Sequence, residues 1–177
     1  MRLADLNELP NAAAARELLR CCGSTRWARE MAQARPFADV DAVAAAVDKI
    51  CDALGAADWL EAFAAHPRIG ESGRAGRSGR SGRSGGAGEA GTSEWSQQEQ
   101  ASARGASDAV RERLAVGHRD YEARFGYIFI VCATGKSAEE MLASLERRLA
   151  HSPSDELRVA AQEQRTITHL RIAKLFQ

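Results

Sequence analysis

Apolar residues recur at helical spacing along most of the chain. One such stripe repeats every three or four positions, at Val43, Val47, Ile50 and Leu54, and predicts a helix over about residues 41–54. Alanine is abundant and β-branched residues are sparse, which favours helix locally. Similar patterns and capping signals predict further helices over about 11–22, 24–35, 58–65, 96–105, 107–125, 137–149 and from 153 toward the C-terminus. We therefore expect an all-α fold, a single-domain bundle of about eight helices spanning residues 1–177.

One apolar stretch lacks this spacing. Residues 126–132 read Gly-Tyr-Ile-Phe-Ile-Val-Cys, an apolar and partly β-branched sequence that resembles a strand. No second strand is predicted, so the stretch would have no partner for a hydrogen-bonded ladder. We expect buried extended chain or a loop-like connection between two helices.

Residues 72–91 differ in composition from everything around them. They read SGRAGRSGRSGRSGGAGEAG, with Arg77, Arg80 and Arg83 at intervals of three. No side chain here can bury much apolar area, and glycine raises the cost of ordering the backbone. We expect a long disordered Gly/Arg/Ser loop inserted in the domain. Phosphate or RNA binding is the alternative, but no aromatic residue is interleaved for base stacking.

Charge and cysteine content exclude several classes of protein. The 177 residues hold 24 Lys plus Arg and 24 Asp plus Glu, and this balance argues against a general binder of nucleic acid or membrane surfaces. No apolar run approaches the roughly 20 residues that span a bilayer, and the N-terminus shows no secretory signal. The four cysteines form no Cys-x-x-Cys pair, so neither a disulfide framework nor a metal site is expected. We expect a cytoplasmic protein with reduced, buried thiols.

His66 has the setting of an acid–base group. It lies at the end of the predicted helix over 58–65 and directly before Pro67. The negative end of the helix dipole favours the imidazolium, while burial opposes it. Such a histidine can exchange protons near neutral pH. The alternative is a histidine that only terminates the helix.

Arg171 is the second candidate. Its position in the last predicted helix places it close to the apolar side that carries Leu157 and Ile167. An arginine that faces inward needs an anion, either from a ligand or from a structural salt bridge. Glu99 is a third candidate, although Ser96 and Glu99 also have the spacing of a capping box that needs no further role.

Several motifs together resemble one known family. They are Cys21-Cys22-Gly23-Ser24 with Trp27, Arg35-Pro36-Phe37, His66-Pro67-Arg68-Ile69-Gly70-Glu71, Ser96-x-x-Glu99-Gln100, Tyr121-Glu122-x-Arg124-Phe125-Gly126, Phe129-Ile130-Val131 and Leu145-Glu146-Arg147-Arg148-Leu149. In this order they resemble 2-oxo-4-hydroxy-4-carboxy-5-ureidoimidazoline (OHCU) decarboxylase, a lyase of uric acid degradation. The resemblance covers nearly the whole chain outside residues 72–91. Any one of the seven motifs would be weak evidence, but seven of them in the family's order make the resemblance specific to this family.

The resemblance implies an all-helical homodimer, with no metal or organic cofactor, that converts OHCU to carbon dioxide and (S)-allantoin. It implies catalytic roles for His66, Glu99 and Arg171. The substrate contacts that it implies come from Pro67, Ser96, Gln97, Gln98, Glu99, Gln100, Phe129, Val131, Cys132, Ala133, Thr134 and Gly135.

The chain departs from the family pattern in three places. Residues 72–91 form an insertion, His118 stands where the family usually has asparagine, and Gln97 and Gln98 make their segment more polar than expected. Two other functions stay open at this point. One is a helical interaction module that binds acidic partners through the Gly/Arg/Ser loop. The other is an enzyme of the same fold that acts on another small ureido acid.

Overall fold

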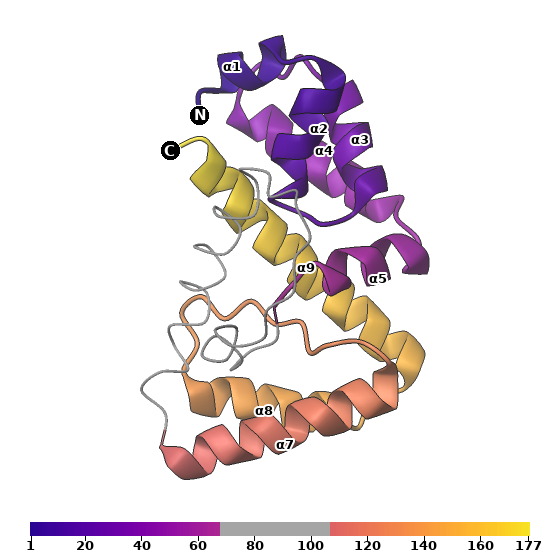
Figure 1. Cartoon of the computed structure of the whole chain (residues 1–177), viewed down its shortest axis with the longest axis vertical. Coiled ribbons are helices and arrows are strands. Elements are labelled where there is room, and N and C mark those ends of the chain that lie inside the picture. Colours follow the sequence, from indigo (N-terminus) through magenta and orange to yellow (C-terminus); the bar gives the residue numbers. More distant parts are fainter. Residues whose placement is uncertain (68–106) are drawn as a thin grey trace, which may run out of the picture. The chain divides into compact units, whose positions relative to one another are not determined.

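A computed structural model describes residues 1–67 and 107–177, and every regular element in these ranges is a helix. The helices are α1 (Leu3–Glu8), α2 (Asn11–Leu19), α3 (Thr25–Gln33), α4 (Val40–Asp52), α5 (Ala56–Ala64), α7 (Asp108–Phe125), α8 (Ala138–Arg148) and α9 (Pro153–Leu175) (Figure 1). The all-α prediction is confirmed, and the described ranges contain eight helices. The observed set of helices differs from the predicted set, because α1 was not predicted. The helix predicted over 96–105 and the loop predicted over 72–91 lie outside the described residues.

Local sequence signals explain where several helices begin and end. The Ser24 hydroxyl accepts a hydrogen bond from the Trp27 backbone N–H at 3.2 Å and caps α3. Ser137 and Glu140 form the capping box predicted for α8, with reciprocal bonds of 3.2 and 2.7 Å. Helix α7 ends at Phe125, and its C-cap Gly126 has a φ of 80°, a left-handed conformation that favours glycine.

The described residues fall into two compact units. Unit 1 comprises residues 1–65 and 161–177, and unit 2 comprises residues 66–160. The boundary lies within α9, which therefore contributes residues to both. The assignment of the whole chain to a single domain stays a prediction.

Unit 1 is built on α3, which packs against α2, α4 and α5. Its centre holds fully buried side chains, including Leu18, Trp27, Met31, Val47 and Phe63. The predicted pair of Trp27 and Met31 thus lies on the inner face of α3. Burial of such large apolar groups supplies most of the free energy that holds the helices together.

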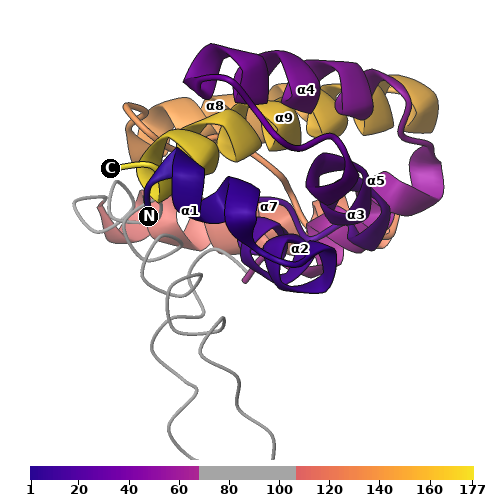
Figure 2. The same ribbon diagram turned by 90° about the horizontal axis from the view of Figure 1, so that it is seen from above.

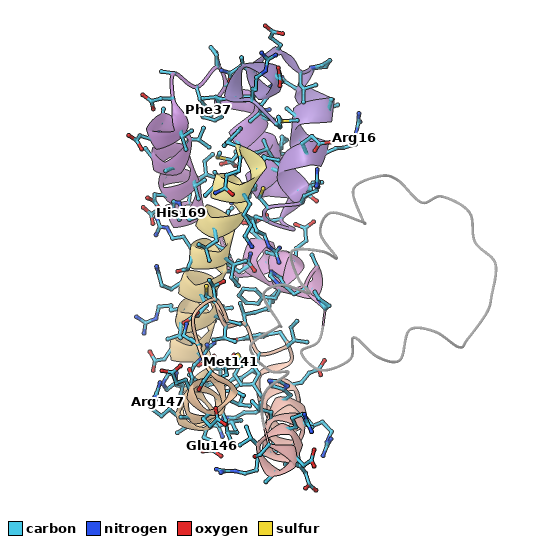
Figure 3. All side chains as sticks on the ribbon, turned by 90° about the vertical axis from the view of Figure 1, so that its left-hand side faces the viewer. Arg16, Phe37, Met141, Glu146, Arg147 and His169 are labelled. Carbon is cyan, nitrogen blue, oxygen red and sulfur yellow. The ribbon has the colours of Figure 1, made fainter. Side chains whose placement is uncertain are left out.

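Helix α4 runs alongside the part of α9 that belongs to unit 1 (Figure 2). The Asp48 carboxylate of α4 joins the two helices, because it accepts hydrogen bonds from Arg165 Nε at 2.7 Å and pairs with His169 Nε2 at 2.8 Å. Figure 3 labels His169 on this side of α9. Arg165 also reaches Asp52 at 2.9 Å, one helical turn after Asp48.

Unit 2 places α7 and α8 side by side around a second apolar cluster (Figure 1). Residues 126–132 form neither helix nor strand, and Phe129, Ile130 and Val131 are nevertheless buried. This confirms the prediction of a buried connection without a ladder. Among the described residues, no helix combines the length and the apolarity that crossing a membrane would require.

Candidate active site

His66 lies one residue beyond Ala65, the C-cap of α5, and its side chain is partly buried. Helix α5 is tied to α3 by two exposed or part-buried contacts. The Arg26 Nη1 atom donates to Asp58 at 3.1 Å, and the Thr25 backbone N–H donates to Glu61 at 3.0 Å. The packing of α3 against α5 therefore positions the chain directly before His66.

Gly23 packs closely against the end of α5. A Cβ atom at this position would lie 2.3 Å from the Ala65 Cβ, far inside contact distance. The helix predicted over 11–22 ends earlier than expected, because α2 ends at Leu19 with Arg20 as its C-cap. The reason for glycine here is the space it leaves for α5.

Arg171 is 3% exposed on the part of α9 in unit 1, so the predicted inward orientation is confirmed. The thiols of Cys21 and Cys22 lie within its electrostatic reach. Burial raises the pKa of Cys21 to about 12 and that of Cys22 to about 11, although the Arg171 charge opposes both shifts. Both thiols are therefore neutral near pH 7.

The implied substrate-binding segment, residues 129–135, lies in unit 2. Its first part is buried, with Phe129, Val131, Cys132 and Ala133 at 4 to 7% exposure, and belongs to or adjoins the apolar cluster. The segment ends in an exposed turn at Thr134 and Gly135. Gly135 has a φ of 78°, a left-handed conformation that favours glycine.

Lys136 follows this turn and fixes its end. The Lys136 ammonium donates to the Cys132 carbonyl at 2.6 Å, and the Lys136 backbone N–H donates to the Ala133 carbonyl at 3.1 Å. These bonds stabilise a tight turn between the buried segment and α8. The turn therefore has a defined backbone conformation.

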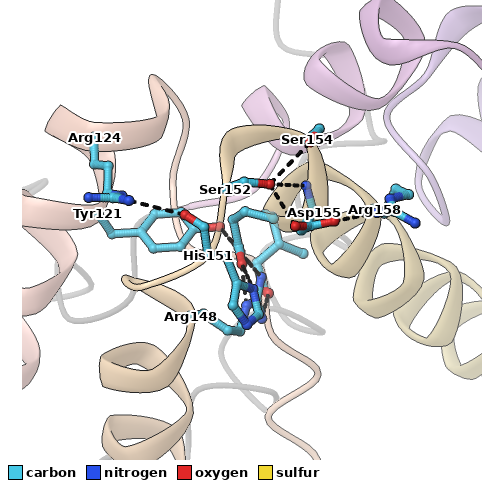
Figure 4. Close-up of polar contacts among 10 residues, drawn as sticks. Tyr121, Arg124, Arg148, His151, Ser152, Ser154, Asp155 and Arg158 are labelled. Carbon is cyan, nitrogen blue, oxygen red and sulfur yellow. Dashed lines mark hydrogen bonds and ion pairs between the residues drawn. The ribbon is translucent and has the colours of Figure 1, made fainter.

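A buried network of charged side chains contacts the first residues of the segment 129–135. The Glu156 carboxylate is fully buried and takes hydrogen bonds from Arg148 Nε at 2.8 Å and Arg148 Nη2 at 2.6 Å. The hydroxyl of Tyr121 donates to the same carboxylate. Burial, with the bond to Glu156, raises the pKa of Tyr121, so its hydroxyl remains a donor. Figure 4 shows this network together with His151, whose Nδ1 lies 2.8 Å from the second Glu156 oxygen.

His118 also adjoins the segment. Its ring centroid lies 5.9 Å from that of Phe129, and its Nε2 has no hydrogen-bond partner among the described residues. Burial lowers the pKa of His118, which favours the neutral ring. A neutral ring packed against an aromatic residue fits a structural role.

Residues 7–173 match the sequence model of a family described as OHCU decarboxylase. This chain belongs to the OHCU decarboxylase family. The family prediction made from the seven motifs is thereby confirmed.

Curated relatives and solved structures agree with this membership. The uric acid degradation bifunctional protein TTL of Arabidopsis thaliana is 38% identical over 156 residues, which are 88% of this chain and 45% of that protein. This chain thus spans less than half of the bifunctional relative. The OHCU decarboxylase of Haloferax volcanii is 29% identical over 153 residues, which are 85% of this chain and 81% of the relative.

A crystal structure of OHCU decarboxylase in the presence of (S)-allantoin superposes with a TM-score of 0.71 and 35% identity, covering 91% of this chain and 97% of that one. A structure of (S)-allantoin synthase has a TM-score of 0.66 at 20% identity, covering 98% of this chain and 54% of that one. The second likeness concerns the fold alone.

The candidate site residues of this OHCU decarboxylase family member fall in three places. His66, Pro67 and residues 129–135 belong to unit 2, whereas Arg171 belongs to unit 1. Ser96, Gln97, Gln98, Glu99 and Gln100 lie outside the described residues. A meeting of His66, Glu99 and Arg171 around one substrate stays a prediction. Within the described ranges, no group of three or more His, Cys, Asp or Glu side chains is arranged to hold a metal ion.

Sequence reasoning missed the roles of Arg148 and Glu156. A signal for Arg148 was present, because it follows Leu145 by three residues and Met141 by seven, which places it on the apolar face of α8. Arginine on an apolar face requires a buried partner. The partner, Glu156, is in the first turn of α9. Acidic residues are common there because they interact favourably with the helix dipole, so its position did not indicate a buried ion pair.

Proposed function

We propose that this chain catalyses the loss of carbon dioxide from OHCU to give (S)-allantoin in uric acid degradation. Membership of the OHCU decarboxylase family carries the proposal, since the family match extends over residues 7–173. The proposed enzyme uses no metal or organic cofactor and acts as a homodimer, as the motif resemblance implies. Its proposed location is the cytoplasm, as the cysteine pattern favours.

His66 is the proposed acid–base residue. Decarboxylation leaves electron density on a ring carbon, which must be spread into the conjugated ring and then protonated on one face. The His66 imidazole takes a proton from the substrate hydroxyl or delivers one to that carbon. Its position directly after α5, whose end is packed against Gly23, supports this role because an acid–base group must be held at a fixed place.

Arg171 is the proposed anion-binding residue. Its guanidinium holds the substrate carboxylate or the developing oxyanion through charge-assisted hydrogen bonds. Support comes from its burial at 3% exposure. A buried positive charge binds an anion more strongly than an exposed one.

The remaining family positions are proposed to hold the substrate in one pose. Glu99 and Gln100 accept hydrogen bonds from the ureido and ring N–H groups. Pro67 and residues 96–98 contact the substrate, and residues 129–135 supply backbone and apolar contacts. A single pose makes protonation stereospecific, because only one face of the ring meets the proton donor.

The test is the decay of freshly prepared OHCU, followed by absorbance against the spontaneous rate. The wild-type chain should accelerate the decay. A His66→Asn variant should lose about 10²–10⁴-fold in kcat, as is common when an acid–base group is removed, with an unchanged circular dichroism spectrum. His118→Asn is the matched control and should retain turnover, since His118 packs against Phe129 as a neutral ring. Absence of acceleration by the wild-type chain rules out the function, and wild-type-like turnover by folded His66→Asn rules out the role of His66.

A further inference from the structure

Arg148 and Glu156 are both charged and almost completely buried, at 4% and 0% exposure. Removing two charges from water costs more than their attraction returns unless their remaining hydrogen-bonding groups are also satisfied. Apolar residues of similar volume often stabilise such a position equally well. The pair is therefore better explained by what it holds in place than by its contribution to stability.

Arg148 holds two groups of the proposed binding segment at once. Its Nη1 donates to the Ile130 carbonyl at 2.8 Å, and its guanidinium carbon lies 4.5 Å from the centroid of the Phe129 ring. One planar side chain thus fixes a backbone group and an aromatic ring in consecutive residues. Lysine cannot reproduce this arrangement, because a single ammonium lacks the fork that reaches two partners in fixed directions.

Glu156 holds Arg148 in that orientation. One Glu156 oxygen accepts hydrogen bonds from both Nε and Nη2 of Arg148. The remaining Nη1 atom donates to the Ile130 carbonyl. The Tyr121 hydroxyl bonds to the same oxygen, and His151 pairs with the other (Figure 4). These bonds come from α7, α8 and the first turn of α9, so the network ties residues 129–135 to three helices of unit 2.

We propose that Arg148 and Glu156 are positioning residues for the decarboxylation, holding residues 129–135 in the conformation that binds the substrate. The proposal rests on the proposed function, because it assumes that this segment contacts OHCU. Neither residue touches the reacting atoms. Each acts through the backbone of Ile130 and the ring of Phe129.

Arg148→Lys is the deciding variant, because it keeps the buried charge beside Glu156 and removes the fork. Arg147→Lys is the matched control: Arg147 is the preceding residue, is exposed, and is labelled on the outside of α8 in Figure 3. Tyr121→Phe controls for stability, since it removes a hydrogen bond to Glu156 and keeps the ring next to Phe129. Two readouts are needed, kcat/KM for OHCU per folded protein and hydrogen exchange of the peptide spanning residues 128–135.

We expect Arg148→Lys to lower kcat/KM by about tenfold or more, because small displacements at a binding segment cost this much, and to speed exchange in residues 128–135. Arg147→Lys should change neither readout by more than about twofold, as is usual for exposed substitutions. Tyr121→Phe should lower the Tm but lower kcat/KM much less than Arg148→Lys does, because Arg148 keeps its bonds to Glu156 and Ile130. Unchanged kcat/KM in folded Arg148→Lys overturns the proposal, as does a loss of kcat/KM in Tyr121→Phe as large as that in Arg148→Lys.

If Arg148→Lys does not fold, Glu156→Gln replaces it with the same expectations, since it keeps the side-chain shape and weakens the hold on Arg148. The exchange measurement separates this proposal from the proposed function. A wild-type chain that does not accelerate OHCU decay rules out the function, while faster exchange in Arg148→Lys than in Arg147→Lys still identifies Arg148 as the residue that orders the segment. Equal exchange in the two variants overturns the positioning role.

Discussion

Replacing Gly23 by alanine should destabilise unit 1 through a single methyl group. The new Cβ would lie 2.3 Å from the Ala65 Cβ and 3.4 Å from the Ala62 carbonyl oxygen. Non-bonded carbons pack at about 3.5–4.0 Å, so the two methyl groups must separate by more than about 1 Å. Neither methyl has a rotamer that avoids the other, because both are bonded directly to the backbone. The backbone near Gly23 or at the end of α5 must therefore move.

The magnitude follows from two opposing effects. Overpacking of this kind costs typically about 1–3 kcal/mol. Gly→Ala returns about 0.4–1 kcal/mol, because alanine restricts the unfolded chain. The two ranges leave a net loss of about 0–2.6 kcal/mol. Because the 2.3 Å approach is far inside contact distance, we expect a net loss of about 1–2 kcal/mol in the free energy of unfolding. For a chain of 177 residues this corresponds to a Tm lower by roughly 2–8 °C.

Urea unfolding of four proteins tests this reasoning: wild type, Gly23→Ala, Ala65→Gly and the double variant. The double variant moves the methyl group from one side of the contact to the other, so it should be more stable than the sum of the single effects by about 1 kcal/mol or more. Activity adds a second readout, because displacement of Ala65 also displaces His66. A shift of about 1 Å at a reacting group can cost 10²-fold in kcat, and the double variant should recover most of that loss. Wild-type stability in Gly23→Ala, or simple additivity in the double variant, would refute the steric explanation.

Two further predictions concern titratable groups in unit 1. Hydrogen bonds from His169 and Arg165 hold the pKa of Asp48 below its usual range, so the stability that this carboxylate contributes is complete above about pH 4 and is lost as pH falls through the lowered pKa. Asp48→Asn should therefore make the urea midpoint less dependent on pH below about pH 4, and an unchanged acid limb would contradict this. The pKa of Cys21 near 12 and of Cys22 near 11 predicts that both thiols resist a disulfide reagent at pH 8 and react once urea unfolds the chain. Mass spectrometry of the labelled peptide should show this, and rapid labelling of native protein would contradict it.

Helix α1 was not predicted from the sequence, for an identifiable physical reason. A helix of six residues is too short to be stable by its own sequence. Contacts distant in sequence support it instead: the Met1 ammonium donates to the Leu175 carbonyl at 3.0 Å, and Asn7 exchanges two hydrogen bonds with the Phe37 backbone at 2.8 and 2.9 Å. None of these partners can be read from the pattern around residues 3–8.

The sequence by itself determined the helical class, the beginnings of most helices, the inward side of Arg171 and the family. These features depend on residue spacings within one helical turn or on the order of motifs along the chain, so they can be predicted from the sequence alone. Only the tertiary structure decided why residue 23 is glycine and which groups Arg148 contacts. Gly23 lies against Ala65, which is 42 positions later in the sequence. Arg148 donates a hydrogen bond to Ile130, which is 18 positions earlier. Such contacts arise when helices pack, and the spacing of residues along one helix carries no information about which distant atom will face it.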